Sequence, residues 1–213
     1  MTKSYFTLGD RDAILIKINS NGDTLATKII QETRIEGCNL KGLVEVGGYV
    51  YALYGNSWNG VIVKIDLDLS IQNVWDVDGI NDSNSDLEVI GSEIFYVGNE
   101  NLYILNQSTL SRTEIYIPYS EIYDLKKYDA NTLLLTGMTE TFGEGIEEIF
   151  LSAVDLTGNI LWYKTYGTPA DDGDGIDIQI MNDTIYTKFH QVNTMHQEHV
   201  SVLVTKSNGD FIE

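Results

Sequence analysis

The stretch LIKINSNGDTLATKI (residues 15–29) decides the fold class, because two alternating runs flank the turn-forming residues NSNGD. Apolar and polar residues that alternate with period two are typical of a β-strand with one buried face. Asn, Ser, Gly and Asp are the residues that tight turns favour. The stretch therefore predicts an antiparallel β-hairpin.

Four later segments repeat this hairpin pattern, and in each copy the first strand closes on a polar residue. The copies span residues 62–75, 103–117, 151–167 and 202–213. The closing residues, with the first copy included, are Asn19, Asp66, Asn106, Asp155 and Lys206, at spacings of 47, 40, 49 and 51 residues. An all-β repeat of this period predicts the blades of a β-propeller.

We therefore expect an all-β fold, a five-bladed β-propeller of four-stranded antiparallel blades in one domain over residues 1–213. The expected blades are 1–31, 38–77, 86–118, 121–166 and 175–213. Residues 4–9 would supply an inner strand of the first blade, and residues 210–213 a short last strand. The irregular seam at the termini leaves three alternatives: a ring with one thin blade, a fragment of a longer array, or a ring closed by a partner strand.

The alternation also predicts which side chains are buried between blades. They are Ile16, Ile18, Val63, Ile65, Ile104, Val154 and Leu203. We expect no helix of three turns anywhere in the chain, since no long stretch has helical periodicity.

The chain has 213 residues, with 13 basic and 32 acidic side chains and a formal net charge of -19. This balance argues against nucleic-acid partners, which need clustered Lys and Arg. No run approaches the roughly 18 apolar residues of a membrane span, so we expect no membrane insertion. Cys38 is the one cysteine, so no disulfide can form within the chain. The first residues lack the apolar core of a signal peptide, which suggests either a cytoplasmic chain or a piece of an exported protein.

The segment VDLTGNILWYKTYGTPADDGDGIDIQ (residues 154–179) resembles the secreted β-propeller repeats of Bacteroidetes-type bacteria. The match falls on the turn residues Asp155 and Gly158, on Trp162, on the pair Tyr166–Gly167 and on an Asp pair that follows. The first repeat matches at Lys17, Gly22 and Asp23. The resemblance implies a propeller at an extracellular or cell-surface location and no single activity.

Asp172, Asp174 and Asp177 alternate with glycine in the same segment. Carboxylates at alternating positions beside a glycine can bind calcium. Asp and Gly also build ordinary turns, and a second connector at residues 76–86 has a similar composition. We favour a structural turn between two blades, with calcium as the only candidate cofactor.

The loops at one end of the expected blades carry the other candidate ligand-binding residues. In a propeller, the second-to-third strand loops and the connectors between blades share one face. The candidates on this face are Trp58, Phe142, Glu144, His190 and His196. Exposed aromatic and acidic side chains suit glycans or protein partners. Packed loop anchors and solvated histidines are the alternatives.

The chain contains no nucleophile elbow, phosphate-binding loop or zinc-protease motif. We therefore expect a non-enzymatic propeller, an interaction or assembly scaffold whose partner is another protein. A carbohydrate-binding propeller is the alternative, with a glycan as the partner. A hydrolase or lyase that uses Glu144, Glu147 or Glu148 is a third hypothesis, since two carboxylates suffice for glycoside hydrolysis.

Overall fold

The computed structural model describes residues 13–30, 39–56, 60–80, 85–118, 120–140, 147–167, 172–192 and 198–212. These ranges contain seventeen β-strands and no helix, which confirms the predicted all-β class. No helix that is long and apolar enough to cross a membrane occurs in these ranges. The chain divides into two compact units, Met1–Asp82 and Ser83–Glu213.

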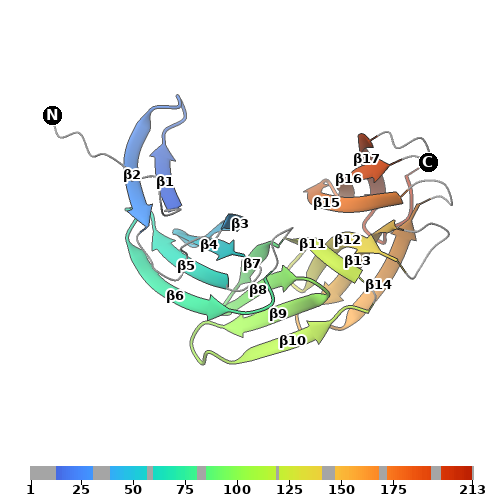
Figure 1. Ribbon diagram of the computed structural model, residues 1–213, viewed down its shortest axis with the longest axis horizontal. Coiled ribbons are helices and arrows are strands. Elements are labelled where there is room, and N and C mark those ends of the chain that lie inside the picture. Colours follow the sequence, from blue (N-terminus) through green and yellow to red (C-terminus); the bar gives the residue numbers. More distant parts are fainter. Residues whose placement is uncertain are drawn as a thin grey trace. The chain divides into compact units, whose positions relative to one another are not determined.

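The first unit contains a two-stranded hairpin and a four-stranded sheet, both antiparallel (Figure 1). The hairpin strands are β1 (Ala13–Ile18) and β2 (Thr24–Ile30). The sheet has the order β3-β4-β5-β6. Its strands are β3 (Asn39–Val46), β4 (Tyr49–Gly55), β5 (Gly60–Asp66) and β6 (Ile71–Val77).

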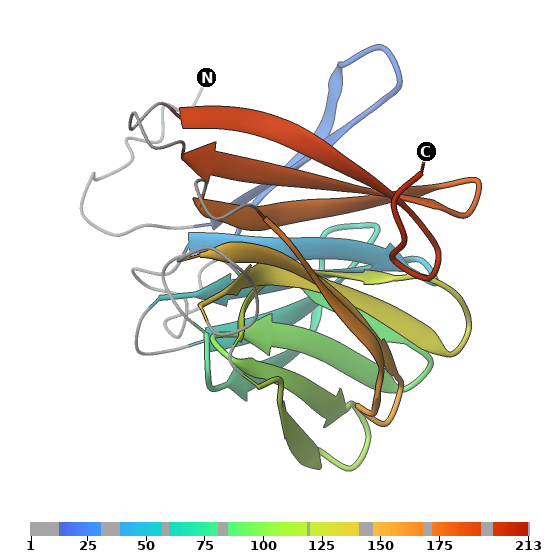
Figure 2. The same cartoon turned by 90° about the vertical axis from the view of Figure 1, so that its right-hand side faces the viewer.

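The second unit contains three antiparallel sheets, which lie face to face as layers in Figure 2. The first sheet comprises β7 (Leu87–Ile90), β8 (Glu93–Gly98), β9 (Asn101–Asn106) and β10 (Arg112–Tyr116). The second comprises β11 (Ser120–Lys127), β12 (Thr132–Thr139), β13 (Glu148–Asp155) and β14 (Ile160–Tyr166). The third comprises β15 (Asp172–Met181), β16 (Thr184–Val192) and β17 (Glu198–Lys206).

Apolar side chains fill the two layers between these three sheets. The layer between β7–β10 and β11–β14 is formed by Phe95, Val97, Leu102, Ile117, Ile122, Leu125, Leu133, Leu135, Phe150 and Val154. The layer between β11–β14 and β15–β17 is formed by Leu134, Ile149, Leu151, Ala153, Tyr166, Ile178, Ile185 and Leu203. Full burial of one such aliphatic or aromatic side chain stabilises the fold by about 1.5–3 kcal/mol. These layers therefore hold the second unit together.

The number of blades differs from the prediction. The sheets β3–β6, β7–β10 and β11–β14 each have four strands in sequential order, which is the topology of a propeller blade. The sheet β15–β17 has three strands, and a bridge between Thr205 and Phe211 begins a fourth. Within the described residues, the N-terminal repeat forms the hairpin β1–β2, so these residues contain four blades and not the predicted five. The expected strand at residues 4–9 lies outside the described residues.

Some of the predicted core residues are buried, and others are exposed. Val63, Ile65 and Val154 are fully buried, and Leu203 is almost so, as predicted. Ile104 is half-buried against the layer between the first two sheets of the second unit.

Two core predictions in the hairpin are wrong, because Ile16 and Ile18 are 59% and 60% exposed. Leu15, which points to the other face of β1, packs on the buried cluster that contains Val63 and Ile65. The hairpin is thus covered on one face only by the rest of its unit.

In four of the five repeats, the polar residue that closes the first strand caps the turn that follows it. The Oδ1 atom of Asp155 accepts the backbone N–H groups of Thr157 and Asn159 at 2.8 and 2.9 Å. Asn19, Asp66 and Asn106 each accept two turn N–H groups through the same atom. Hydrogen bonds from the Asn159 and Thr157 side chains, together with these N–H groups, lower the pKa of Asp155. These four repeats therefore share one local requirement, an oxygen acceptor at the start of the turn, whereas Lys206 closes the fifth strand without one.

We predict that Asp155→Ala lowers the melting temperature by a few degrees at neutral pH, while Asp155→Asn retains most of it. Asparagine keeps the Oδ1 acceptor, as Asn19 and Asn106 do in their own turns. Because the folded-state pKa of Asp155 is lowered, its stabilisation is present above the unfolded-state pKa. It is lost as the pH falls through the folded-state value, so the Ala deficit should shrink in acid. Equal losses for Ala and Asn in thermal melts followed by circular dichroism would contradict the cap.

Candidate functional site

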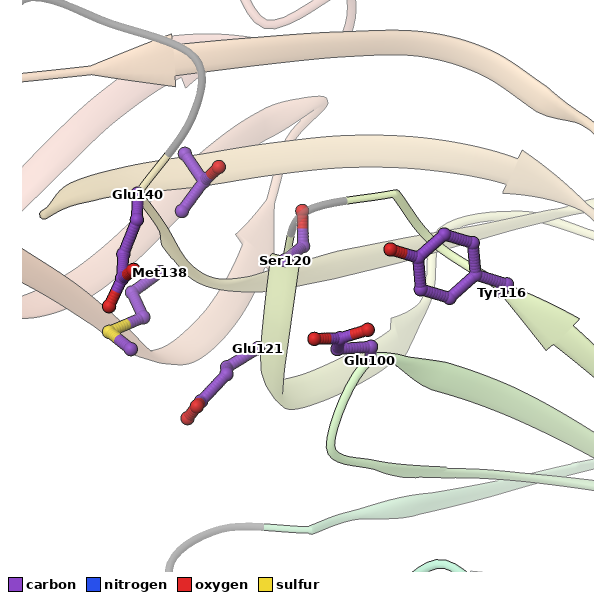
Figure 3. A pocket seen from close by; sticks show the side chains of 7 residues that line it. Glu100, Tyr116, Ser120, Glu121, Met138 and Glu140 are labelled. Carbon is purple, nitrogen blue, oxygen red and sulfur yellow. The ribbon is translucent and has the colours of Figure 1, made fainter.

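A pocket of about 250 Å³ opens where the sheets β7–β10 and β11–β14 meet (Figure 3). The residues that line it come from the ends of strands or the turns beside them. They are Glu100, Tyr116, Ser120, Glu121, Met138, Thr139 and Glu140. Every one of these residues belongs to the second unit, so the pocket lies within a single unit.

Backbone hydrogen bonds fix the connectors that form this end of the two sheets. The N–H of Ile117, directly after β10, donates to the Glu100 carbonyl at 2.8 Å. The N–H of Ile122 in β11 donates to the Asn99 carbonyl, also at 2.8 Å. The β8–β9 turn, the β10–β11 connector and the start of β11 are thereby joined. The pocket thus lies at the face where the propeller prediction placed the ligand-binding loops.

The floor of the pocket is a set of buried hydroxyl groups. Ser120 and Thr139 are cross-strand partners at the ends of β11 and β12, and both side chains are buried. The Ser120 hydroxyl bonds the Pro118 carbonyl at 3.1 Å and the Tyr163 hydroxyl at 2.8 Å. Burial raises the pKa of Tyr163. These contacts hold Ser120 in place, and no lining histidine is available to activate it as a nucleophile.

Three carboxylates give the pocket its charge, since the described residues that line it include no Lys, Arg or His. Glu121 and Glu140 lie with Met138 on one side of Ser120, and Glu100 and Tyr116 lie on the other (Figure 3). Tyr116 is 52% exposed, so its ring offers apolar surface beside the carboxylates. This lining suits a ligand that carries positive charge and an apolar body.

Tyr123, two residues further along β11, orients the carboxylate of Glu121. Its hydroxyl donates to Glu121 Oε2 at 3.1 Å. Burial raises the pKa of Tyr123 well above its ordinary range, and the charges of Asp174 and Glu121 add to this effect. Tyr123 therefore remains a neutral hydrogen-bond donor to Glu121.

The Asp-rich segment is a strand and not the turn that we favoured from the sequence. Residues Asp172–Met181 form β15, in which Asp174 pairs with His190 and Asp177 pairs with Lys188. Asp174 Oδ1 is buried without a hydrogen-bond partner. Burial raises the pKa of Asp174; the His190 charge opposes this effect and the Glu121 charge adds to it.

The side chain of Asp172 lies outside the described part of the structure, so the calcium site at Asp172, Asp174 and Asp177 stays a prediction from the sequence. Among the described residues, no group of three or more His, Cys, Asp or Glu side chains could hold a metal ion. His190 and His199 do not converge, because His190 pairs with Val200 and His199 with Gln191. Successive residues of a strand point to opposite faces, so these two rings are separated by the sheet.

The pocket lies at the end of the sheets where the sequence predicted the ligand-binding loops, but sequence reasoning did not single out the residues of the pocket. Of the described candidates, the structure brings together Asp174 and His190, as cross-strand partners. The other ligand-face candidates lie outside the described residues: Trp58, Phe142, Glu144 and His196. The signal that could have found the pocket is position, because Glu100 lies in the β8–β9 turn and Ser120 begins β11 directly after the β10–β11 connector.

Comparison with known proteins identifies similar folds. No family model and no curated protein matches the sequence. A protein of unknown function from Bacteroides caccae is 10% identical, with a TM-score of 0.63 over 92% of this chain and 72% of that chain. The AfRom2 CNH domain is 9% identical, with a TM-score of 0.52 over 91% of this chain and 67% of its own.

A third similar structure is an enzyme. The dihydro-heme d1 dehydrogenase NirN, in complex with DHE, is 11% identical, with a TM-score of 0.52 over 92% of this chain and 43% of its own. At such identities, the three similarities show that the fold is shared. They carry no information on activity.

We predict that Asp174→Asn raises the melting temperature at neutral pH and that millimolar calcium leaves the wild-type value unchanged. Because the folded-state pKa of Asp174 is raised, the stability it contributes is full below the unfolded-state pKa and is lost as the pH rises through the folded-state value. The advantage of asparagine should therefore vanish in acid. Asp177→Asn, two pairs further along β15, is the matched control. Stabilisation by calcium that Asp174→Asn removes would contradict this prediction.

Proposed function

We propose that the chain is a non-enzymatic interaction module of the propeller type and that the acidic pocket is where it binds another protein. The observation that carries the proposal is the lining, in which Glu100, Glu121 and Glu140 surround a cavity without a counter-charge among its seven residues. A Lys or Arg side chain from a partner would supply that charge.

The shape of the pocket fits such a side chain. Tyr116 and Met138 offer apolar surface for an aliphatic stem, while the carboxylates face the charged end. Long basic side chains bind in this way, with the stem on apolar groups and the charge beside an acid or an aromatic ring. The net charge of -19 also favours the approach of a basic partner.

The lining supports binding over catalysis. Ser120 is engaged by Pro118 and Tyr163, and a nucleophile needs a general base within hydrogen-bond reach. We propose on this ground that the module has no enzymatic activity and needs no cofactor. Hydrolysis or elimination of a glycan substrate would overturn this part of the proposal.

Carbohydrate binding is the second candidate function, and Tyr116 favours it. A half-exposed tyrosine ring beside carboxylates can stack on a sugar while the acids accept hydrogen bonds from its hydroxyl groups. A glycan array distinguishes this candidate, because a neutral glycan would bind with little dependence on salt.

We predict saturable binding of short fluorescent peptides that carry one Arg or Lys between glycines, measured by fluorescence anisotropy. The same peptide with norleucine should bind more weakly, and added salt should weaken the binding of the basic peptides. Glu121→Gln and Glu140→Gln should each weaken the binding roughly two- to fivefold, the range of a solvent-accessible ion pair.

Glu114→Gln is the matched control, since Glu114 is an exposed residue of β10 outside the pocket lining. Two results would refute the proposed site: equal binding of the basic and norleucine peptides, or equal effects of the Glu114 and Glu121 changes.

A further inference from the structure

Asp124 in β11 carries a buried carboxyl group that is not part of the pocket lining. It lies where β11 meets β15 and the start of β7. Its side chain is only 7% exposed. Its Oδ2 atom accepts the backbone N–H of Ile178 in β15 at 2.6 Å. The chain is irregular on both sides of this bond, with one bulge between Ile122 and Asp124 and another between Gly175 and Asp177. A side chain thus supplies a hydrogen bond that joins two sheets.

Lys126 and Asp86 extend this junction to the first sheet of the unit. The Lys126 Nζ atom lies 2.9 Å from Asp86 Oδ2 and 3.7 Å from Asp124 Oδ1. Asp86 directly precedes β7, and its side chain is 13% exposed, against 31% for Lys126. One ammonium group therefore serves two carboxyl groups that are largely shielded from water.

The charges of this cluster do not balance when both carboxyl groups are ionised. Two carboxylates and one ammonium leave an excess negative charge, which is costly in a shielded site. The neighbouring charged groups are Glu88 in β7, which accepts the Lys127 N–H at 3.3 Å, and Lys127 itself. Beyond the Ile178 amide, the titratable residues of β15 nearest in sequence are Asp174 and Asp177. Two carboxyl groups that share a site normally hold one proton between them.

We propose that Asp124 keeps its proton in the folded protein, where it is hydrogen-bonded to Asp86, and that loss of this proton loosens β15 from β11. A neutral carboxyl group at Asp124 still accepts the Ile178 N–H and can donate to Asp86. Without the proton, the excess charge favours a state in which Asp124 is hydrated and the Ile178 bond is broken. The cluster is thus a pH-sensitive latch between sheets.

The electrostatics of the cluster support this assignment. Burial raises the pKa of Asp124 well above its ordinary value, and the hydrogen bond and charge of Asp86 add to this effect. Lys126 and the Ile178 N–H oppose it without reversing it. Burial acts to lower the pKa of Lys126, but Asp124 and Asp86 raise it overall. The lysine stays charged, so the proton that is lost with rising pH is the one on Asp124.

The latch is tested by hydrogen exchange of the Ile178 amide as a function of pH in the full chain. Between the unfolded-state and folded-state pKa values of Asp124, the closed form binds one proton more than the open form. The protection factor should then fall by up to about tenfold per pH unit in the wild type, the limit for one linked proton. Below the unfolded-state pKa, protection should be constant.

Asp124→Asn separates the latch from a purely structural hydrogen bond. Asparagine keeps an acceptor for Ile178 and a donor for Asp86, but it cannot ionise. We expect high protection with no dependence on pH in this variant, and wild-type behaviour in the exposed control Glu114→Gln. In the wild type, the NMR chemical shift of the Asp124 carboxyl carbon should report a pKa above the ordinary range of aspartate.

Three results would overturn the latch. They are a flat wild-type protection profile, the same pH slope in Asp124→Asn, or an Asp124 carboxyl group that is ionised at mildly acidic pH. The NMR titration needs only the wild-type protein, so the proposal can be refuted even if the variant does not fold.

Discussion

The second unit depends on one constraint, the burial of β11–β14 on both faces. Leu133 and Leu135 point into one apolar layer and Leu134 into the other. Successive side chains of a strand alternate between faces, so a strand between two neighbouring sheets buries both of its faces. This explains the apolar run Leu133–Leu135 in β12, and the buried hydroxyl of Thr136 donates to the Phe150 carbonyl at 2.7 Å. The outer strand β14 is polar or half-exposed along much of its length. The positions of the pocket and the buried carboxyl cluster follow from this central sheet.

Much of the fold could be predicted from the sequence, because its determinants are local. The oxygen acceptors at Asn19, Asp66, Asn106 and Asp155 act within their own turns, so they repeat visibly along the chain. The blade count could not be predicted in the same way. Alternation shows that β1 has an apolar face, but it does not show whether another element covers that face, and Ile16 and Ile18 are exposed.

The candidate site was predictable in position and not in composition. Topology places the short connectors of neighbouring blades at one end, which is where the pocket lies. The residues that line it follow no period, since Glu100, Ser120 and Glu140 come from three different connections between strands. Asp174 shows the opposite failure: the closely spaced aspartates resemble a turn or a calcium loop in sequence, yet Asp172, Asp174 and Asp177 lie within β15, whose backbone pairs with β16.

The turn caps also bear on how the protein folds. Each cap and its partners lie within one hairpin, and every sheet is built from strands that are consecutive in the chain. Contacts between near neighbours in sequence form with little loss of chain entropy, so each sheet can organise before the sheets meet. A whole repeat could therefore be duplicated or lost in evolution without rewiring the others, with adjustment needed only at the apolar surface of its immediate neighbours.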